Sequence, residues 1–459
     1  MIIHAFMVPH PPVAVPEVGR GAEKEITTTL DSYRRTADEI AALKPDTIVL
    51  STPHSTMYAD YFLISPGVHA HGDFRQYGHP EVSFDVDYDE QFTTELSRRC
   101  RSEGISAGTD YERDPSLDQG TMVPLYYILQ KYKDFRLVRV GLSGLPLREH
   151  YRLGEQIRAT TDALGRRVVY VASGDLSHCQ KKDGPYGLHP EGPLYDEKIM
   201  HTMGSGNFGE LLEYDSHFLS RAEECGHRSF VIMAGALDGL SVTPHVFSHE
   251  ATFGVGYGFV SYDIGGDNPD RHFLQKFEKN TENQLAATGD TFVKLARASV
   301  ESWVRTHRRL SLPDGLPDEM LHTRAGAFVS IHEFDDLRGC IGTIAPTKKN
   351  IAEEIISNAI SACSRDPRFH EIRTDELPFL SISVDILSPS ERISSPDQLD
   401  VHRYGVICST PDGRRGLLLP DLEGVDTVQE QIRIACQKGG IDPDDPSLIL
   451  ERFEVIRHE

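Results

Sequence analysis

The sequence has no apolar run that could cross a membrane, because a spanning helix needs about 20 consecutive apolar residues. Its amino-terminal apolar stretch ends at Val8 and has no basic region before it, unlike a secretion signal. These two absences predict a cytoplasmic protein with no membrane partner.

Cysteine is sparse and irregularly placed. The seven cysteines are an odd number, and no two of them have CxxC spacing. A disulfide framework or a structural zinc site would show paired or regularly spaced cysteines. We therefore expect reduced thiols.

Positive charge is also in short supply, with 47 Lys and Arg against 70 Asp and Glu and a formal net charge of -23. Nucleic-acid binding relies on cationic surface, so nucleic acid is excluded as an expected partner. The remaining composition, 39% hydrophobic and 25% charged, is that of a globular protein. A length of 459 residues predicts two or three domains.

Three histidines follow short apolar stretches that are typical of β-strands. His10 follows residues 1–8 within a Pro-His-Pro-Pro string, His54 follows residues 47–50 after a proline, and His178 follows residues 167–172. Segments with helical periodicity separate these strands, which predicts an α/β fold with a mostly parallel sheet flanked by helices. Because the carboxyl ends of such strands form the ligand crevice, we expect the histidines to share one site.

Acidic residues near these histidines have two interpretations each. Asp175 either orients a ring nitrogen of a nearby histidine or caps a turn. Glu224, just before an apolar helical segment, either caps that helix or completes a metal site. Two imidazoles and a carboxylate leave three positions of an octahedral ion open, as Fe(II) requires to bind substrate and dioxygen together.

Residues 1–263 resemble the class III extradiol dioxygenases of the LigB type, a fold that also includes the Memo proteins. The resemblance rests on strings around the three histidines, on a polar turn and on an acidic loop: Pro9-His10-Pro11-Pro12, Pro53-His54, Asp118-Gln119-Gly120, Ser173-Gly174-Asp175-Leu176-Ser177-His178 and Glu223-Glu224-Cys225-Gly226. It implies that His10 and His54 bind iron and that His178 is the catalytic acid/base.

The resemblance leaves the last metal ligand open between two neighbours. Glu224 offers the carboxylate of the dioxygenases, whereas Cys225 matches the Cys-Gly of the Memo proteins. Gln119 stands where ring-cleaving members usually have a histidine, and an amide cannot shuttle a proton.

Two functions therefore compete. In the first, a bound Fe(II) supports ring opening of a catecholic or aminophenolic small molecule, with Asp175 and Gln119 beside the acid/base. In the second, Fe(II) or another divalent transition metal helps to bind a small molecule or a modified peptide without oxygenase turnover.

The carboxyl-terminal half resembles the AMMECR domain family over residues 275–459, through the strings LRGCIGT, DPRF, SVDILS, GLLLPD and GVDT. Its elements give an α+β pattern, and the turn-rich residues 264–274 predict a linker short enough to favour docking of the two domains. Arg338 and Cys340 either form a reactive thiol that binds anions or are structural residues.

The two halves together resemble the family called AmmeMemoRadiSam system protein A. That resemblance implies a radical SAM enzyme and a Memo-like protein as partners. The sequence has no CxxxCxxC run for an iron-sulfur cluster, so radical SAM chemistry would come from a partner.

Overall fold

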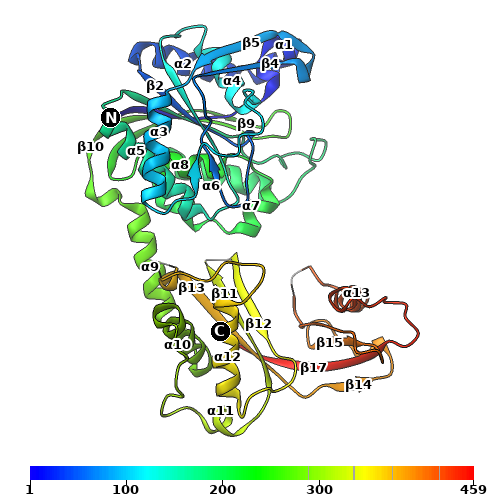
Figure 1. Cartoon of the computed structure of the whole chain (residues 1–459). Helices are drawn as coiled ribbons and strands as arrows, with labels where there is room; N and C mark the ends of the chain where they lie inside the picture. Colours follow the sequence, from blue (N-terminus) through cyan, green and yellow to red (C-terminus); the bar gives the residue numbers. More distant parts are fainter. Residues whose placement is uncertain (288, 334–335, 375, 423) are drawn as a thin grey trace. The chain divides into compact units, whose positions relative to one another are not determined.

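The computed structural model describes residues 1–287, 289–333, 336–374, 376–422 and 424–459. They divide into two compact units, Met1–Phe277 and Glu278–Glu459 (Figure 1). Among the described residues, no helix combines the length and the apolar character that crossing a membrane requires.

The amino-terminal unit alternates strands and helices. Its strands are β1 (Ile2–Val8), β2 (Thr47–Thr52), β3 (Phe62–Leu63), β4 (His69–Phe74), β5 (His79–Asp87), β6 (Ala107–Gly108), β7 (Arg136–Gly141), β8 (Val168–Ser173), β9 (Leu240–Glu250) and β10 (Tyr257–Asp267). Its α-helices are α1 (Pro16–Gly19), α2 (Thr27–Leu43), α3 (Glu90–Ser102), α4 (Gln119–Ile128), α5 (Leu147–Leu164), α6 (Glu191–Ser205), α7 (Ser216–Ala222) and α8 (His227–Ala236), followed by α9 (Phe273–Ala287), which contains the boundary between the units.

The main sheet of this unit has the strand order β7-β2-β8-β1-β10-β9. The first four strands are parallel, and β10 and β9 continue the sheet in antiparallel fashion. This confirms the predicted α/β class with a mostly parallel sheet. The hairpin of β9 and β10 adds an antiparallel edge to it.

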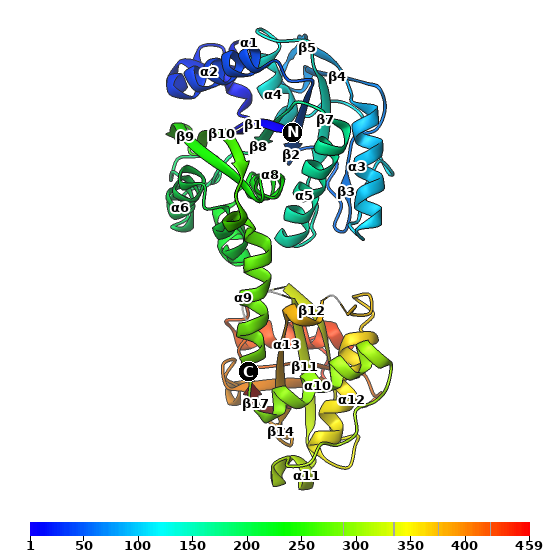
Figure 2. The ribbon, with the colours of Figure 1, turned by 90° about the vertical axis from the view of Figure 1, so that its left-hand side faces the viewer.

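Helices cover both faces of this sheet (Figure 2). Successive residues of β1 show the division, because Phe6 packs in one core with α2 and α4, whereas Met7 packs in the other with α5 and α8. Successive side chains of a strand point to opposite faces of the sheet. Every position is therefore apolar when helices cover both faces. The predicted strands read as continuous apolar runs for this reason.

The polar, glycine-containing residues 69–79 predict a loop, yet they form β4, the turn after it and the start of β5. Ala70 and Phe74 are buried while His69 and His71 are exposed, so the segment alternates with the period of a strand.

The carboxyl-terminal unit has α10 (Thr291–Thr306), α11 (Asp318–His322), α12 (Ile351–Ser364) and α13 (Val428–Gly439). Its strands are β11 (Gly326–Glu333), β12 (Asp336–Gly342), β13 (Leu380–Leu387), β14 (Glu391–Ile393), β15 (Tyr404–Ser409), β16 (Arg415–Leu418) and β17 (Ile449–His458). The strands pair antiparallel in the order β12-β11-β13-β17-β15-β16, with β14 on β17. The predicted α+β class is confirmed.

Candidate metal centre

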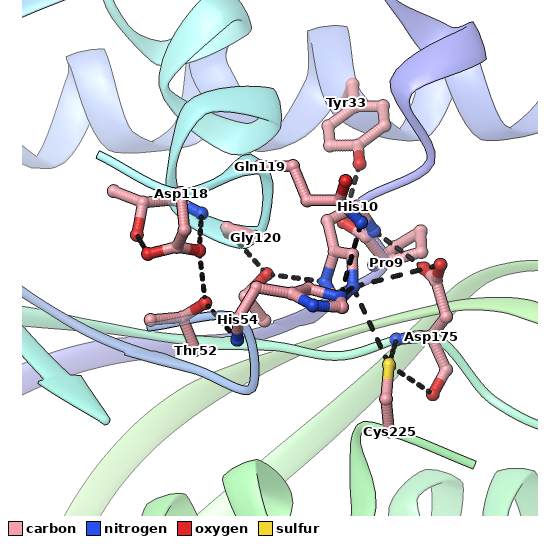
Figure 3. A network of polar contacts seen from close by, with 12 residues as sticks. Pro9, His10, Tyr33, Thr52, His54, Asp118, Gln119, Gly120, Asp175 and Cys225 are labelled. Carbon is pink, nitrogen blue, oxygen red and sulfur yellow. Dashed lines mark hydrogen bonds and ion pairs between the residues drawn. The ribbon is translucent and has the colours of Figure 1, made fainter. Parts of the chain in front are cut away.

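The three histidines that follow predicted strands come from neighbouring strands. β2, β8 and β1 are adjacent and parallel, so their carboxyl ends meet at one edge of the sheet. The chain leaves these strands toward His54, His178 and His10, and the Nε2 atoms of His10 and His54 lie 2.9 Å apart (Figure 3). This edge is the expected crevice of an open α/β sheet.

Cys225 reaches the same place because two glycines let separate backbones touch. A Cβ on Gly174 would lie 2.1 Å from the Cα of Gly226, which is closer than real Cβ atoms approach. This contact sets the loop after β8 against the start of α8. As a result, the Asp175 backbone N–H donates to Cys225 Sγ at 3.3 Å, and that sulfur lies 3.6 Å from His10 Nε2.

A hydrogen-bond relay sets the tautomer of His10. The Ser173 hydroxyl donates to the Gly120 carbonyl at 2.6 Å, and its oxygen lies 3.0 Å from His10 Nδ1. Because the hydroxyl proton is already used, Nδ1 must be the donor in this second contact. The lone pair of Nε2 is therefore free to face His54 and Cys225.

His10, His54 and Cys225 form a group whose donor atoms all lie within 4.8 Å of one another. Around one ion with usual bond lengths, two nitrogens are about 2.9–3.3 Å apart and a nitrogen and a sulfur about 3.1–3.6 Å apart, from octahedral to tetrahedral angles. The observed separations of 2.9 and 3.6 Å are close to these values. The three side chains therefore fit one transition-metal ion.

Glu224, the other expected ligand, is turned toward a helix. Its Oε2 accepts a hydrogen bond of 2.5 Å from the His227 backbone N–H at the start of α8. Burial raises the pKa of Glu224 to about 7, although this hydrogen bond opposes the rise. The structure brings Cys225, rather than Glu224, to the two histidines.

Asp175 and His178 flank the same group. Asp175 Oδ1 accepts a 2.7 Å hydrogen bond from the His10 backbone N–H, and burial raises the pKa of Asp175 to about 6. His178 offers a ring nitrogen within 4.8 Å of both the Asp175 carboxylate and Cys225 Sγ. Burial lowers the pKa of His178, which favours the neutral imidazole.

Gln119 lies on the other side of His54. Its Nε2 is 3.3 Å from His54 Nε2, and its Oε1 accepts a hydrogen bond from the Tyr77 hydroxyl. Asp118 caps α4 by accepting from the Thr121 backbone N–H at 3.1 Å, which fixes the turn that carries Gln119.

A cavity of about 740 Å³ opens beside His54 and Gln119. Leu117 and Met122 contribute apolar surface, while most of the other lining side chains are polar: Ser55, Thr56, His71, Asp73, Arg75, Gln76, Asp114, Ser116 and Asp118. A ligand in this cavity would lie next to the metal ligands.

Sequence reasoning overlooked two side chains that set up this centre. Ser173 directly follows the predicted strand over residues 167–172, within the same string as Asp175 and His178, and it is the last residue of β8. Tyr77 gave no local signal, because its contact with Gln119 depends on the folding of the β4–β5 hairpin.

In the carboxyl-terminal unit, the side chains of Arg338 and Cys340 have different hydrogen-bond partners. Arg338 Nε donates to Glu376 at 2.6 Å, and its Nη1 donates to the His370 carbonyl at 2.7 Å. Cys340 Sγ instead accepts from the Ser330 hydroxyl at 3.2 Å. These contacts are of the kind that the structural interpretation expects, and the reactive thiol stays a prediction.

The fold and the ligand group together define an α/β protein with a candidate metal centre at the carboxyl edge of its sheet. The chain belongs to the family of the catalytic LigB subunit of aromatic ring-opening dioxygenase, whose model matches residues 4–260. Residues 293–458 match the AMMECR1 family.

Similar proteins share one or both halves. Protein CA_C1420 of Clostridium acetobutylicum is 39% identical and covers 99% of this chain and 98% of its own length. A Thermotoga maritima protein is 48% identical over 37% of this chain and 97% of its own length. The crystal structure of PH0010 from Pyrococcus horikoshii is 29% identical, covers 37% of this chain and 91% of that chain, and gives a TM-score of 0.35.

Proposed function

We propose that the amino-terminal unit is a non-haem Fe(II)-dependent, extradiol dioxygenase-like enzyme that acts on a catecholic or aminophenolic small molecule. The observation that carries this proposal is the His10, His54 and Cys225 group, with the Nε2 lone pair of His10 directed into it. Bound Fe(II) would supply the open coordination positions and the electron transfer that join a dihydroxylated ring to dioxygen.

The surrounding residues would transfer the proton, complete the ligand set and position the substrate. His178 is kept neutral by burial and can accept the proton of a substrate hydroxyl. Asp175 holds the backbone of His10, and the thiolate of Cys225 would replace the usual carboxylate as the anionic ligand. Gln119 can orient a substrate oxygen through its amide N–H group.

The experiment is anaerobic reconstitution of the full chain with Fe(II), followed by exposure to catechols and aminophenols in air. Ring opening should give coloured products and consume dioxygen, and His10→Ala and Cys225→Ser should abolish both. His201→Ala, which removes an exposed histidine of α6, is the matched control and should keep the activity.

A second function is favoured by Gln119 and by the polar lining of the cavity. A glutamine cannot relay a proton, and a cavity with few apolar side chains suits a modified peptide or another polar ligand. In this proposal the centre binds metal and ligand without oxygenase turnover, as one component of a radical SAM-associated modification system. Stoichiometric iron without oxygen uptake for any tested substrate would favour this alternative.

A further inference from the structure

A second group of potential metal ligands lies near the first centre and shares no residue with it. Cys179, His189 and Glu223 each place a donor atom within 4.8 Å of the other two. A thiol, an imidazole and a carboxylate are the donor types that zinc combines in proteins. We propose that these three residues bind a second divalent metal ion, of the zinc type.

Backbone pairing places the first two ligands side by side. Gln180 and Leu188 form an antiparallel bridge, and the His189 backbone N–H donates to the Cys179 carbonyl at 3.3 Å. Residues directly opposite each other in such a pair present their side chains on the same face, with Cβ atoms about 4.5–5.5 Å apart. The thiol and the imidazole are therefore brought together by the fold of the loop itself.

The tautomer of His189 suits metal binding. Its Nδ1 lies 3.0 Å from the Arg221 carbonyl oxygen, which can only accept a hydrogen bond. The proton is consequently on Nδ1, and the lone pair of Nε2 is available. Histidines that bind metals are commonly oriented in this way, by a carbonyl at the nitrogen that does not coordinate.

Glu223 completes the group from a different element. It ends α7 with φ of 49°, a left-handed conformation that is unfavourable for a residue with a side chain. Glu223 is exposed whereas Cys179 is fully buried, so an ion held between them would keep one side open to water. Three protein ligands and one open position are typical of zinc sites that also hold a water molecule.

The second ion would hold in place the loop that packs against His178, a residue that flanks the first centre. This loop, residues 180–188, connects Cys179 to His189. It carries Tyr186, whose ring centroid lies 5.0 Å from that of His178. Coordination would tie both ends of this loop to the segment after α7. This role goes beyond the proposed dioxygenase-like reaction and does not depend on it.

Metal stoichiometry tests the proposal. The full chain, stripped of metal and dialysed against Zn²⁺, should bind two ions, and His189→Ala should bind one. His10→Ala should also bind one, whereas the control His201→Ala should bind two. Glu223→Gln, at an exposed position that puts the fold at little risk, should weaken the second binding step, whereas Glu197→Gln in the exposed surface of α6 should not.

The two sites can fail separately in this experiment. One ion that is lost in His10→Ala and retained in His189→Ala would overturn the second site. One ion that is lost in His189→Ala and retained in His10→Ala would support the second site and argue against the first.

Limited proteolysis supplies an independent readout. Lys181 and Lys182 are exposed within the loop, so trypsin should cut there. Zn²⁺ should slow this cut in the unsubstituted chain and in His10→Ala but not in His189→Ala. A cutting rate that Zn²⁺ leaves unchanged in the unsubstituted chain would contradict the proposal.

Discussion

At the scale of single residues, Ser173 orients His10 through two hydrogen bonds. Its hydroxyl donates to the Gly120 carbonyl, and its oxygen accepts from the imidazole Nδ1–H of His10. Removing the hydroxyl leaves the buried Nδ1 without this partner and lets the other tautomer compete. We expect Ser173→Ala to weaken metal binding by about 10- to 100-fold, as outer-shell substitutions typically do.

Metal titration of the purified variants would measure this effect. Ser51→Ala is the matched control, because Ser51 is a buried serine of the neighbouring strand whose hydroxyl pairs with Ser229 at 2.6 Å instead. Equal losses of affinity in both variants would point to a general loss of packing.

His150 is a buried histidine away from the metal ligands, and its surroundings suit only the neutral ring. Its Nδ1 donates to the Pro146 carbonyl at 3.1 Å, while its Nε2 accepts from the Ser143 backbone N–H at 3.4 Å. Burial lowers the pKa of His150 to about 3, from an unfolded value near 6.5. Stability from this residue is complete above the unfolded pKa and is lost as the pH falls.

The expected loss at pH 5 is about 2 kcal/mol for this one group. Urea unfolding of the metal-free chain at pH 7 and pH 5 should therefore show a smaller pH-dependent loss in His150→Gln than in the unsubstituted chain. The exposed His201→Gln should leave the loss unchanged. An equal pH dependence in all three proteins would show that His150 does not cause this loss of stability.

At the scale of elements, the contact of Gly174 with Gly226 joins the loop after β8 to the start of α8. A methyl group on Gly174 would meet backbone rather than a movable side chain. We expect Gly174→Ala to cost about 1–3 kcal/mol of stability, the usual range for overpacking, and to weaken metal binding by displacing Cys225.

Gly266→Ala is the control for this substitution, because a Cβ there would have open space and the backbone does not have positive φ. Thermal unfolding and metal titration of both variants would test the prediction. Metal binding that survives Gly174→Ala unchanged would mean that the position of Cys225 does not depend on this contact.

The strands that carry the site could be predicted because their apolar runs are buried on both faces. β1, β2 and β8 each end within one or two residues of the expected position, and the parallel pattern implied that His10 and His54 would meet. Adjacency in the sheet could not be derived from the pattern itself, and neither could the choice between Glu224 and Cys225. That choice depends on how the backbone turns at Gly226, and the turn is set by the tertiary contact of Gly226 with Gly174.

Local polarity misled the prediction elsewhere. The alternation of small or apolar residues with histidines in β4 is short and interrupted by polar groups, so it lacks the apolar content of the central strands. The helical periodicity of residues 284–305 also predicts one continuous helix, whereas α9 ends at Ala287 and α10 begins at Thr291; residue 288 lies outside the described residues. Gly289, with φ of 96°, and the cap Asp290 separate the two helices.

At the scale of the whole molecule, each unit has hydrophobic cores of its own. Among the described residues, two hydrophobic clusters belong to the amino-terminal unit and three consist of residues from Phe292 onward. A unit with a separate core can fold without the rest of the chain. The acidic net charge of -23 adds a general repulsion that opposes non-specific association.

Separate expression of residues 1–287 and 289–459 would test how far the units depend on each other. We expect both fragments to fold, and residues 1–287 to bind as much metal as the full chain, because every proposed ligand lies in that fragment. Because one chain keeps the two units at a high effective concentration, we expect them to dock, and each transition should be a few degrees higher in the full chain, where 1 kcal/mol corresponds to about 2–4 °C for units of this size. Melting temperatures that match in fragments and full chain would mean that the units do not stabilise each other, and an unfolded fragment would contradict the separate cores.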